Sequence, residues 1–179
     1  KALKIDGRAF IDGRRTAALS GESRPSINPA NGQRLVDVAS CGPEDADRAV
    51  VSARAVFERG TWSRMAPGDR KKVLIRWAEL IGTHAEELAL LETLDVGKPI
   101  NDTSKVDVPS AMRTIQWSGE AVDKIYAEIA PTSPDCLALV QRLPLGVVAA
   151  IVPWNFPLST TAWKLAPALA TGNSVILKP

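Results

Sequence analysis

The stretch that decides the fold is Gly146-Val147-Val148-Ala149-Ala150-Ile151-Val152, followed by Pro153-Trp154-Asn155-Phe156-Pro157 and later by Ser174-Val175-Ile176-Leu177. Both apolar runs have strand length and lack polar alternation, which predicts strands buried on both faces of a parallel sheet. Between them, residues 158–170 predict a helix that Gly172-Asn173 ends. Strand, helix and strand over about thirty residues make a βαβ unit, whose crossover should be right-handed.

The residues before 145 predict short strands followed by helices. A strand at 8–11 runs into Asp12-Gly13, a pair that favours hairpin turns, and a turn at 28–32 precedes a second strand at 35–39. Helices are predicted to begin at Pro43, near Pro67, at Thr83 and at Asp107. Proline is tolerated in a first helical turn, and the helix predicted over 107–127 has Pro109 there.

These elements predict an α/β protein, with N-terminal helical and β-hairpin segments followed by the first βαβ unit of a Rossmann-like parallel sheet. We expect residues 1–135 to form the N-terminal strands and helices. Residues 136–144 are expected to form a hairpin arm for oligomerisation, in which 137–142 is an exposed strand. Residues 145–179 are expected to form a truncated βαβ unit.

Composition excludes several classes of function. The 179 residues carry 22 basic and 20 acidic side chains without a basic run, so nucleic-acid binding has no electrostatic support. No apolar run approaches the ~20 residues that a membrane span needs. Cys41 and Cys136 lie far apart without CxxC spacing, which indicates two free thiols and a reducing cytoplasm.

Two polar residues follow the predicted parallel strands. In open α/β sheets ligands bind beyond the carboxyl ends of the strands, where Asn155 and Lys178 stand. Asn155 is either an amide donor to an oxyanion or a turn residue that bonds its own backbone. Lys178 either binds ribose or phosphate oxygens or is solvated. The chain contains neither GxGxxG nor GxxxxGK[ST], so no nucleotide fingerprint supports the first alternative.

The sequence nevertheless resembles the aldehyde dehydrogenase superfamily over the whole chain. The residues that carry the resemblance are 151–157, 162–173 and 175–179, joined by 90–99 and 10–13. Within the superfamily the chain is similar to bacterial dehydrogenases of ω-aminoaldehydes, in particular γ-glutamyl-γ-aminobutyraldehyde and guanidinobutyraldehyde. The resemblance implies the N-terminal part of that fold, an incomplete cofactor domain, NAD or NADP as cofactor and homo-oligomers.

The resemblance also implies roles for single residues. Asn155 matches the oxyanion-hole amide, and Lys164 matches a lysine of a charge relay near the general base. The remaining matches are to the cofactor border (Ile151, Val152, Pro153, Trp154), the adenosine ribose (Lys178) and the aldehyde tunnel (Phe156, Trp163). Ser26, Ile27 and Asp95 match a structural monovalent-cation site. Asp107 is expected either to meet the cationic end of an aminoaldehyde or only to cap its helix.

The family's mechanism needs groups that these residues do not supply. A cysteine thiolate adds to the aldehyde, hydride leaves the thiohemiacetal for the nicotinamide, and a glutamate activates water against the thioester. Neither the cysteine motif nor the glutamate motif occurs here, and Cys41 and Cys136 stand in other contexts. The chain alone is therefore expected to be inactive and, with an uncovered strand edge, to persist only with further chain or as an assembly.

Two alternatives to an enzyme remain open. One is a catalytically dead binding or assembly module that ends at Pro179, and the other is an NAD-sensing domain. The second would need a complete dinucleotide fold. The choice between NAD and NADP depends on residues beyond Lys178.

Overall fold

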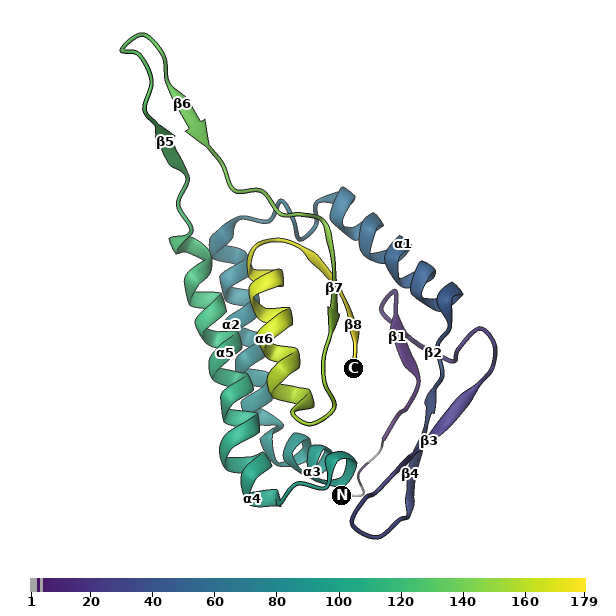
Figure 1. Ribbon diagram of the computed structural model, residues 1–179. Coiled ribbons are helices and arrows are strands. Elements are labelled where there is room, and N and C mark those ends of the chain that lie inside the picture. The colour runs from purple at the N-terminus through teal and green to yellow at the C-terminus, as the bar shows by residue number, and fades with distance from the viewer. Residues whose placement is uncertain (1–2, 4) are drawn as a thin grey trace.

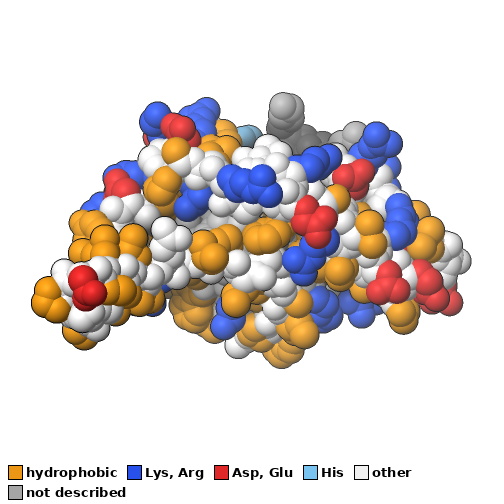
Figure 2. Space-filling model, turned by 90° about the horizontal axis from the view of Figure 1, so that it is seen from above, with side chains coloured by type: hydrophobic (Ala, Val, Ile, Leu, Met, Phe, Trp, Pro, Cys, Tyr) orange, Lys and Arg blue, Asp and Glu red, His pale blue; other side chains and the backbone are white. Residues whose placement is uncertain are grey.

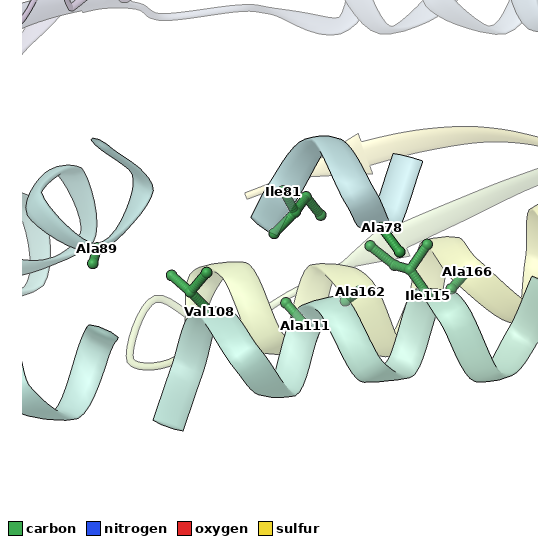
Figure 3. Close-up of a cluster of buried hydrophobic side chains, with 8 residues drawn as sticks. All are labelled: Ala78, Ile81, Ala89, Val108, Ala111, Ile115, Ala162 and Ala166. Atoms are coloured by element: carbon green, nitrogen blue, oxygen red, sulfur yellow. The ribbon is translucent and has the colours of Figure 1, made fainter. Parts of the chain in front are cut away.

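The computed structural model describes residues 3 and 5–179 and has three adjacent helices at its centre, α2 (Pro67–Thr83), α5 (Val108–Ala121) and α6 (Pro157–Ala170) (Figure 1). Their contacts are made by small and branched side chains (Figure 3). The buried cluster comprises Ala78, Ile81, Ala89, Val108, Ala111, Ile115, Ala162 and Ala166. Ala89 belongs to the helix over residues 85–96; because four of the other seven residues are alanines, α2, α5 and α6 approach closely enough to exclude water.

The predicted βαβ unit is confirmed. Strands β7 (Val147–Ile151) and β8 (Ser174–Lys178) are parallel, with Val147 opposite Ser174 and Ile151 opposite Lys178, and α6 connects them. The expectation that both strands are buried on both faces is wrong, because Ile151 is 73% exposed and only Ala150 of β7 is fully buried. Helices α6 and α1 (Pro43–Arg59) contact this pair, but among the described residues no third strand adjoins it.

The N-terminal residues form two antiparallel hairpins. Strands β1 (Ala9–Ile11) and β2 (Arg14–Thr16) are joined by Asp12-Gly13, both with positive φ, as predicted. The predicted strand at 35–39 is β4 (Arg34–Ala39), which pairs with β3 (Ser23–Ile27). Strand β3 was not predicted because its sequence, Ser-Arg-Pro-Ser-Ile, has no apolar alternation.

The helix predicted to begin at Asp107 begins earlier. After α3 (Ala85–Val96), the chain passes through α4 (Ile100–Asp102) and the π-helical turn η1 (Thr103–Asp107) directly into α5. The N–H of Val108 donates to the carbonyl of Thr103, five residues back. Pro109 has no N–H for the carbonyl four residues before it, and a π-turn accommodates that loss. The helix ends at Ala121 and continues as the 3₁₀ turn η2 (Val122–Lys124), short of the predicted 127.

A hairpin of β5 (Glu128–Ala130) and β6 (Ala138–Val140) projects from the helices (Figure 1). The arm predicted at 136–144 contains β6, but its partner strand lies before that range. The arm and the segment after it expose large apolar side chains: Ile129, Leu137, Leu139, Val140, Leu143 and Leu145. Hydrophobic side chains gather on the protruding end of the molecule (Figure 2). No helix in the described part of the chain is long and apolar enough to cross a membrane.

Helix α5 depends on glycine for its approach to α2. A Cβ added at Gly119 would lie 3.0 Å from Cβ of Leu74 and 3.3 Å from Cδ1 of Ile75, whereas one added at Gly68 meets nothing within 4 Å. We expect Gly119→Ala to lower the free energy of unfolding in urea by about 1–3 kcal/mol through overpacking. The matched variant Gly68→Ala should leave it unchanged or raise it by up to about 1 kcal/mol. Equal effects at the two positions would contradict this packing.

Candidate functional site

The carboxyl ends of β7 and β8 form one edge that carries most of the predicted cofactor residues. Ile151 and Lys178 are register partners, and the N–H of Val152 donates to the carbonyl of Lys178 at 3.1 Å. The side chains of Ile151, Trp154 and Lys178 are exposed here, with Trp154 at 79%, while Val152 is buried. An exposed apolar surface beside a lysine suits a nucleotide, whose base and sugar need apolar contact and whose hydroxyls need a donor.

The turn between β7 and α6 presents Asn155. Its side chain is exposed and forms no hydrogen bond with any described residue, so the alternative of a turn residue bonding its own backbone is not what the structure shows. The next residue, Phe156, is the N-cap of α6, and its carbonyl accepts from Thr160 N at 2.9 Å and Thr160 Oγ1 at 2.7 Å. The Asn155 amide thus lies beside a helix N-terminus, whose partial positive charge favours an oxyanion.

Phe156 and Trp163 lie on one side of α6. They are seven residues apart, two helical turns, and both are partly exposed. Two aromatic surfaces therefore follow Asn155 along one side of α6, as lining of an aldehyde site would require. Lys164 is exposed on the same helix, and its part in a charge relay stays a prediction.

A buried charge cluster lies beneath Phe156. The ammonium of Lys98 is 2.7 Å from Oδ2 of Asp107, 3.7 Å from Oε1 of Glu92 and 3.4 Å from the centroid of the Phe156 ring. The Glu92 and Asp107 side chains are each 3% exposed. Asp107 has helical dihedral angles and makes no cap hydrogen bond, so its interpretation as a helix cap is wrong. Its contact with a substrate cation stays a prediction.

Sequence reasoning missed Glu92 and Lys98. A signal for Glu92 was present, because it shares one face of α3 with the apolar residues Ala85, Leu88 and Ala89. A carboxylate on the buried face of a helix indicates a buried ionic partner. Lys98 gave no such signal, since it lies in the break between α3 and η1, where no helical periodicity indicates that a side chain is buried.

Burial and the neighbouring Asp107 carboxylate raise the pKa of Glu92 to about 7. Within the described residues, neither carboxylate oxygen of Glu92 accepts a hydrogen bond. Two carboxylates therefore share one ammonium, and the pair holds a proton that exposed glutamate would lose in mild acid.

Two of the predicted cation ligands lie together. The Ser26 hydroxyl donates to Oδ1 of Asp95 at 2.8 Å, across 69 residues of sequence. The β3–β4 register shifts between Ser26 and Ile27, where carbonyls leave the regular ladder. This arrangement fits ligation by backbone carbonyls and one carboxylate. No group of three His, Cys, Asp or Glu side chains that could hold a metal occurs among residues 3 and 5–179. The cation site stays a prediction.

Both cysteines are free and exposed, as predicted. Partial desolvation of its sulfur and the nearby Asp45 carboxylate raise the pKa of the Cys41 thiol, which disfavours the thiolate. Cys136 lies between β5 and β6, outside the turn that carries Asn155. The structure brings neither thiol into the β7–α6 turn.

Comparison with known proteins shows which proteins the chain resembles. A sequence model described as "Aldehyde dehydrogenase family" matches residues 16–179. The NADP/NAD-dependent aldehyde dehydrogenase PuuC of Escherichia coli is 54% identical over 178 residues, which are 99% of this chain and 36% of that protein.

Two solved structures are also similar. Indole-3-acetaldehyde dehydrogenase AldA of P. syringae, in complex with NAD+ and IAA, is 61% identical with a TM-score of 0.98, over 99% of this chain and 36% of that one. γ-Glutamyl-γ-aminobutyraldehyde dehydrogenase of Burkholderia cenocepacia is 52% identical with a TM-score of 0.97, over the same shares. The chain therefore spans about a third of the length of its relatives.

The raised pKa of Glu92 makes a prediction about stability. Unfolded glutamate ionises near pH ~4.3, so between about pH 4.3 and 7 the folded protein binds more protons, and its stability falls as pH rises through this window. Glu92→Gln should therefore raise the free energy of unfolding at pH 8 by about 1–3 kcal/mol and change it little at pH 4. Denaturant titrations of both proteins between pH 4 and pH 8 measure this difference in the free energy of unfolding.

The matched control is Glu86→Gln, an exposed glutamate on the same helix α3, which should show no such pH-dependent difference. If Glu92→Gln destabilised the protein equally at pH 4 and pH 8, the carboxyl would not be ionising within the cluster as inferred.

Proposed function

The chain belongs to the aldehyde dehydrogenase family, and on this premise we propose that it is the N-terminal part of a longer NAD(P)-dependent enzyme that oxidises an aldehyde to a carboxylic acid. The observation that carries the proposal is the exposed, unbonded Asn155 amide beside the carboxyl ends of two parallel strands. The thiolate nucleophile and the glutamate base would come from residues outside these 179. The isolated chain is then inactive.

Asn155 has the chemistry of an oxyanion donor. When a thiolate adds to an aldehyde, a C–S bond forms and the carbonyl electron pair moves onto oxygen as a negative charge. An amide N–H held at that oxygen stabilises this charge more than it stabilises the neutral aldehyde. The N-terminus of α6 adds a favourable dipole at the same place. Phe156 and Trp163 would exclude water and orient the aldehyde carbon chain.

The strand edge suits the cofactor, which supplies a hydride acceptor when bound. Lys178 would donate to the adenosine ribose, and Trp154 with Ile151 to Pro153 would form the wall against which it lies. The names of relatives support both forms of the cofactor, since one is NADP/NAD-dependent and another binds NAD+. Helix α6, which follows the turn that carries these residues, packs into the buried core through Ala162 and Ala166, which supports a wall held in place before a ligand binds.

For the substrate we favour an ω-aminoaldehyde, because two similar proteins are named for amino aldehydes: the γ-glutamyl-γ-aminobutyraldehyde dehydrogenase, 52% identical, and an aminoacetaldehyde dehydrogenase of Pseudomonas aeruginosa, 48% identical. The second candidate is an aryl acetaldehyde, supported by the 61% identity to the indole-3-acetaldehyde dehydrogenase and by the exposed rings of Phe156 and Trp163. The Asp107 carboxylate favours the first candidate only if the Lys98 ion pair opens to admit a substrate cation.

Further parts of the proposal concern regions outside the strand edge. Lys164 would assist a charge relay toward the general base. Ser26, Ile27 and Asp95 would hold a monovalent cation, a role that the Ser26–Asp95 contact supports. Two free thiols suit the reducing cytoplasm.

We also propose that the β5–β6 arm joins copies of the enzyme. Ile129 and Leu139 are cross-strand partners and both are more than half exposed on a hairpin that stands clear of the helices (Figure 1). A two-stranded hairpin with exposed apolar side chains is marginal alone and gains stability by packing on another surface. A second copy offers the same surface in a symmetric assembly.

The test of the oxyanion role uses the full-length enzyme. Asn155→Ala should lower kcat by about 10²–10³-fold with γ-glutamyl-γ-aminobutyraldehyde and leave the KM for NAD+ nearly unchanged. Lys178→Ala should instead weaken NAD+ binding about tenfold, the loss of one hydrogen bond. Asn101→Ala, an exposed asparagine outside the site, is the matched control. Higher kcat/KM for indole-3-acetaldehyde would select the second substrate.

An Asn155→Ala enzyme as active as the wild type would contradict the oxyanion role. A full-length protein without aldehyde oxidation would leave the binding or assembly module as the remaining explanation.

The role of the β5–β6 arm in assembly is tested by introducing negative charges into it. Ile129→Asp and Leu139→Asp should raise the dissociation constant of the oligomer more than about tenfold, because a buried apolar contact becomes an unpaired charge. Ser133→Asp, at the tip of the same hairpin, adds the same charge without removing an apolar side chain and should have little effect. Analytical ultracentrifugation measures both, and an unchanged assembly in the first two variants would exclude the arm from the interface.

A further inference from the structure

Lys98 joins the neighbouring segments α3 and η1 to the start of α6, which is distant in sequence. It follows α3, its carboxylate partner Asp107 ends η1, and the ring beneath its ammonium belongs to Phe156 at the start of α6. The ammonium is 3.4 Å from the ring centroid, close enough for a strong cation–π interaction. The Lys98 side chain is only 18% exposed, so water weakens this contact little.

A second contact ties the same two segments. The buried Ser159 hydroxyl donates to the backbone carbonyl of Asp107 at 3.3 Å. Thr160 closes the first turn of α6 by bonding the Phe156 carbonyl through both N and Oγ1. Residues 156–160 are thus held to η1 directly by the Ser159 hydrogen bond and indirectly by Lys98, which contacts both Phe156 and Asp107. Asn155 immediately precedes this fastened turn.

The cluster is poorly explained by stability alone. Burial of charges costs several kcal/mol for each ion unless partners satisfy them, and apolar residues of similar volume often stabilise a protein as well or better. Here Glu92 lacks hydrogen bonds within the described residues, and a π-helical turn precedes the helix that Asp107 enters. Such turns occur often at functional sites. Both features indicate that the cluster holds neighbouring residues in place rather than stabilising the fold.

We propose that Lys98 is a positioning residue, which holds the ring of Phe156 through its ammonium and thereby fixes the amide of Asn155 where the oxyanion forms. Asp107 fixes the ammonium in turn, and Glu92 supplies a second, weaker attraction. The inference rests on the proposed oxyanion role of Asn155. Since Phe156 has non-helical dihedral angles, φ −139° and ψ 61°, and directly follows Asn155, a rotation there moves Asn155.

The experiment removes the Lys98 ammonium without leaving the Glu92 and Asp107 carboxylates both buried and unpaired. In the full-length enzyme, Glu92→Gln is compared with Glu92→Gln/Lys98→Gln, in which the new amide can still donate to Asp107. We expect kcat to fall at least about tenfold between the two, because small misplacement of a catalytic group is costly, with the KM for NAD+ unchanged. Glu92→Gln/Lys98→Arg should keep most of the kcat of Glu92→Gln, since a guanidinium also pairs with carboxylate and stacks on rings. Lys105→Gln, an exposed lysine of η1, is the control.

Comparing the kcat loss caused by removing Lys98 in the presence and absence of Asn155 separates positioning from a general structural effect. If Lys98 acts through Asn155, its removal should cost no further kcat in an Asn155→Ala background. Glu92→Gln/Lys98→Met, which replaces the ammonium by an uncharged chain of similar length, should likewise show no added loss in that background, which keeps the test available if the Lys98→Gln double variant does not fold.

An equal loss with and without Asn155, or a kcat within twofold of Glu92→Gln, would overturn the inference. These outcomes are distinct from failure of the proposed function, which would appear as unchanged kcat in Asn155→Ala itself.

Discussion

The close approach of α5 to α2 and α6 is the constraint on which the rest of the structure depends. It is possible because alanines and Gly119 stand where the helices meet, so the backbones come near enough for the larger Ile115 and Val108 to fill the space (Figure 3). With α6 fixed in this way, its N-terminus has one position relative to η1. The turn from β7 into α6 then must present Asn155 at the carboxyl ends of the parallel strands.

Two kinds of interaction act on that turn in different ways. The apolar helix contacts are non-directional and hold α6 as a whole, whereas the cluster of Glu92, Lys98 and Asp107 is directional and acts on its first residues. A site that binds an oxyanion needs its donor held within a fraction of an ångström. Buried charge is destabilising by itself, and the raised pKa of Glu92 records that cost, but it specifies geometry more sharply than apolar packing does.

The sequence alone predicted the elements that depend on local interactions and missed those that depend on contacts between distant residues. The βαβ unit and the Asp12-Gly13 hairpin depend on local apolar runs and turn residues, and both are present. Strand β3 has no apolar alternation, and η1 depends on hydrogen bonding around Pro109, so neither was predicted. The burial of β7 was overestimated because it depends on neighbours outside the strand. The roles of Asn155 and Lys178 came from family resemblance, while Lys98 was missed because nothing in its local sequence indicates burial or its contact with the distant Phe156.

The measurement that tests this account most directly is a crystal structure of the full-length protein with NAD+ bound. The account predicts that the adenosine ribose lies within hydrogen-bond distance of Lys178 Nζ, with the cofactor along Ile151 to Trp154. The side-chain amide of Asn155 should face the position of the aldehyde oxygen, with Lys98 still against Phe156. A cofactor bound away from the ends of β7 and β8, or an Asn155 side chain turned from the site, would contradict it.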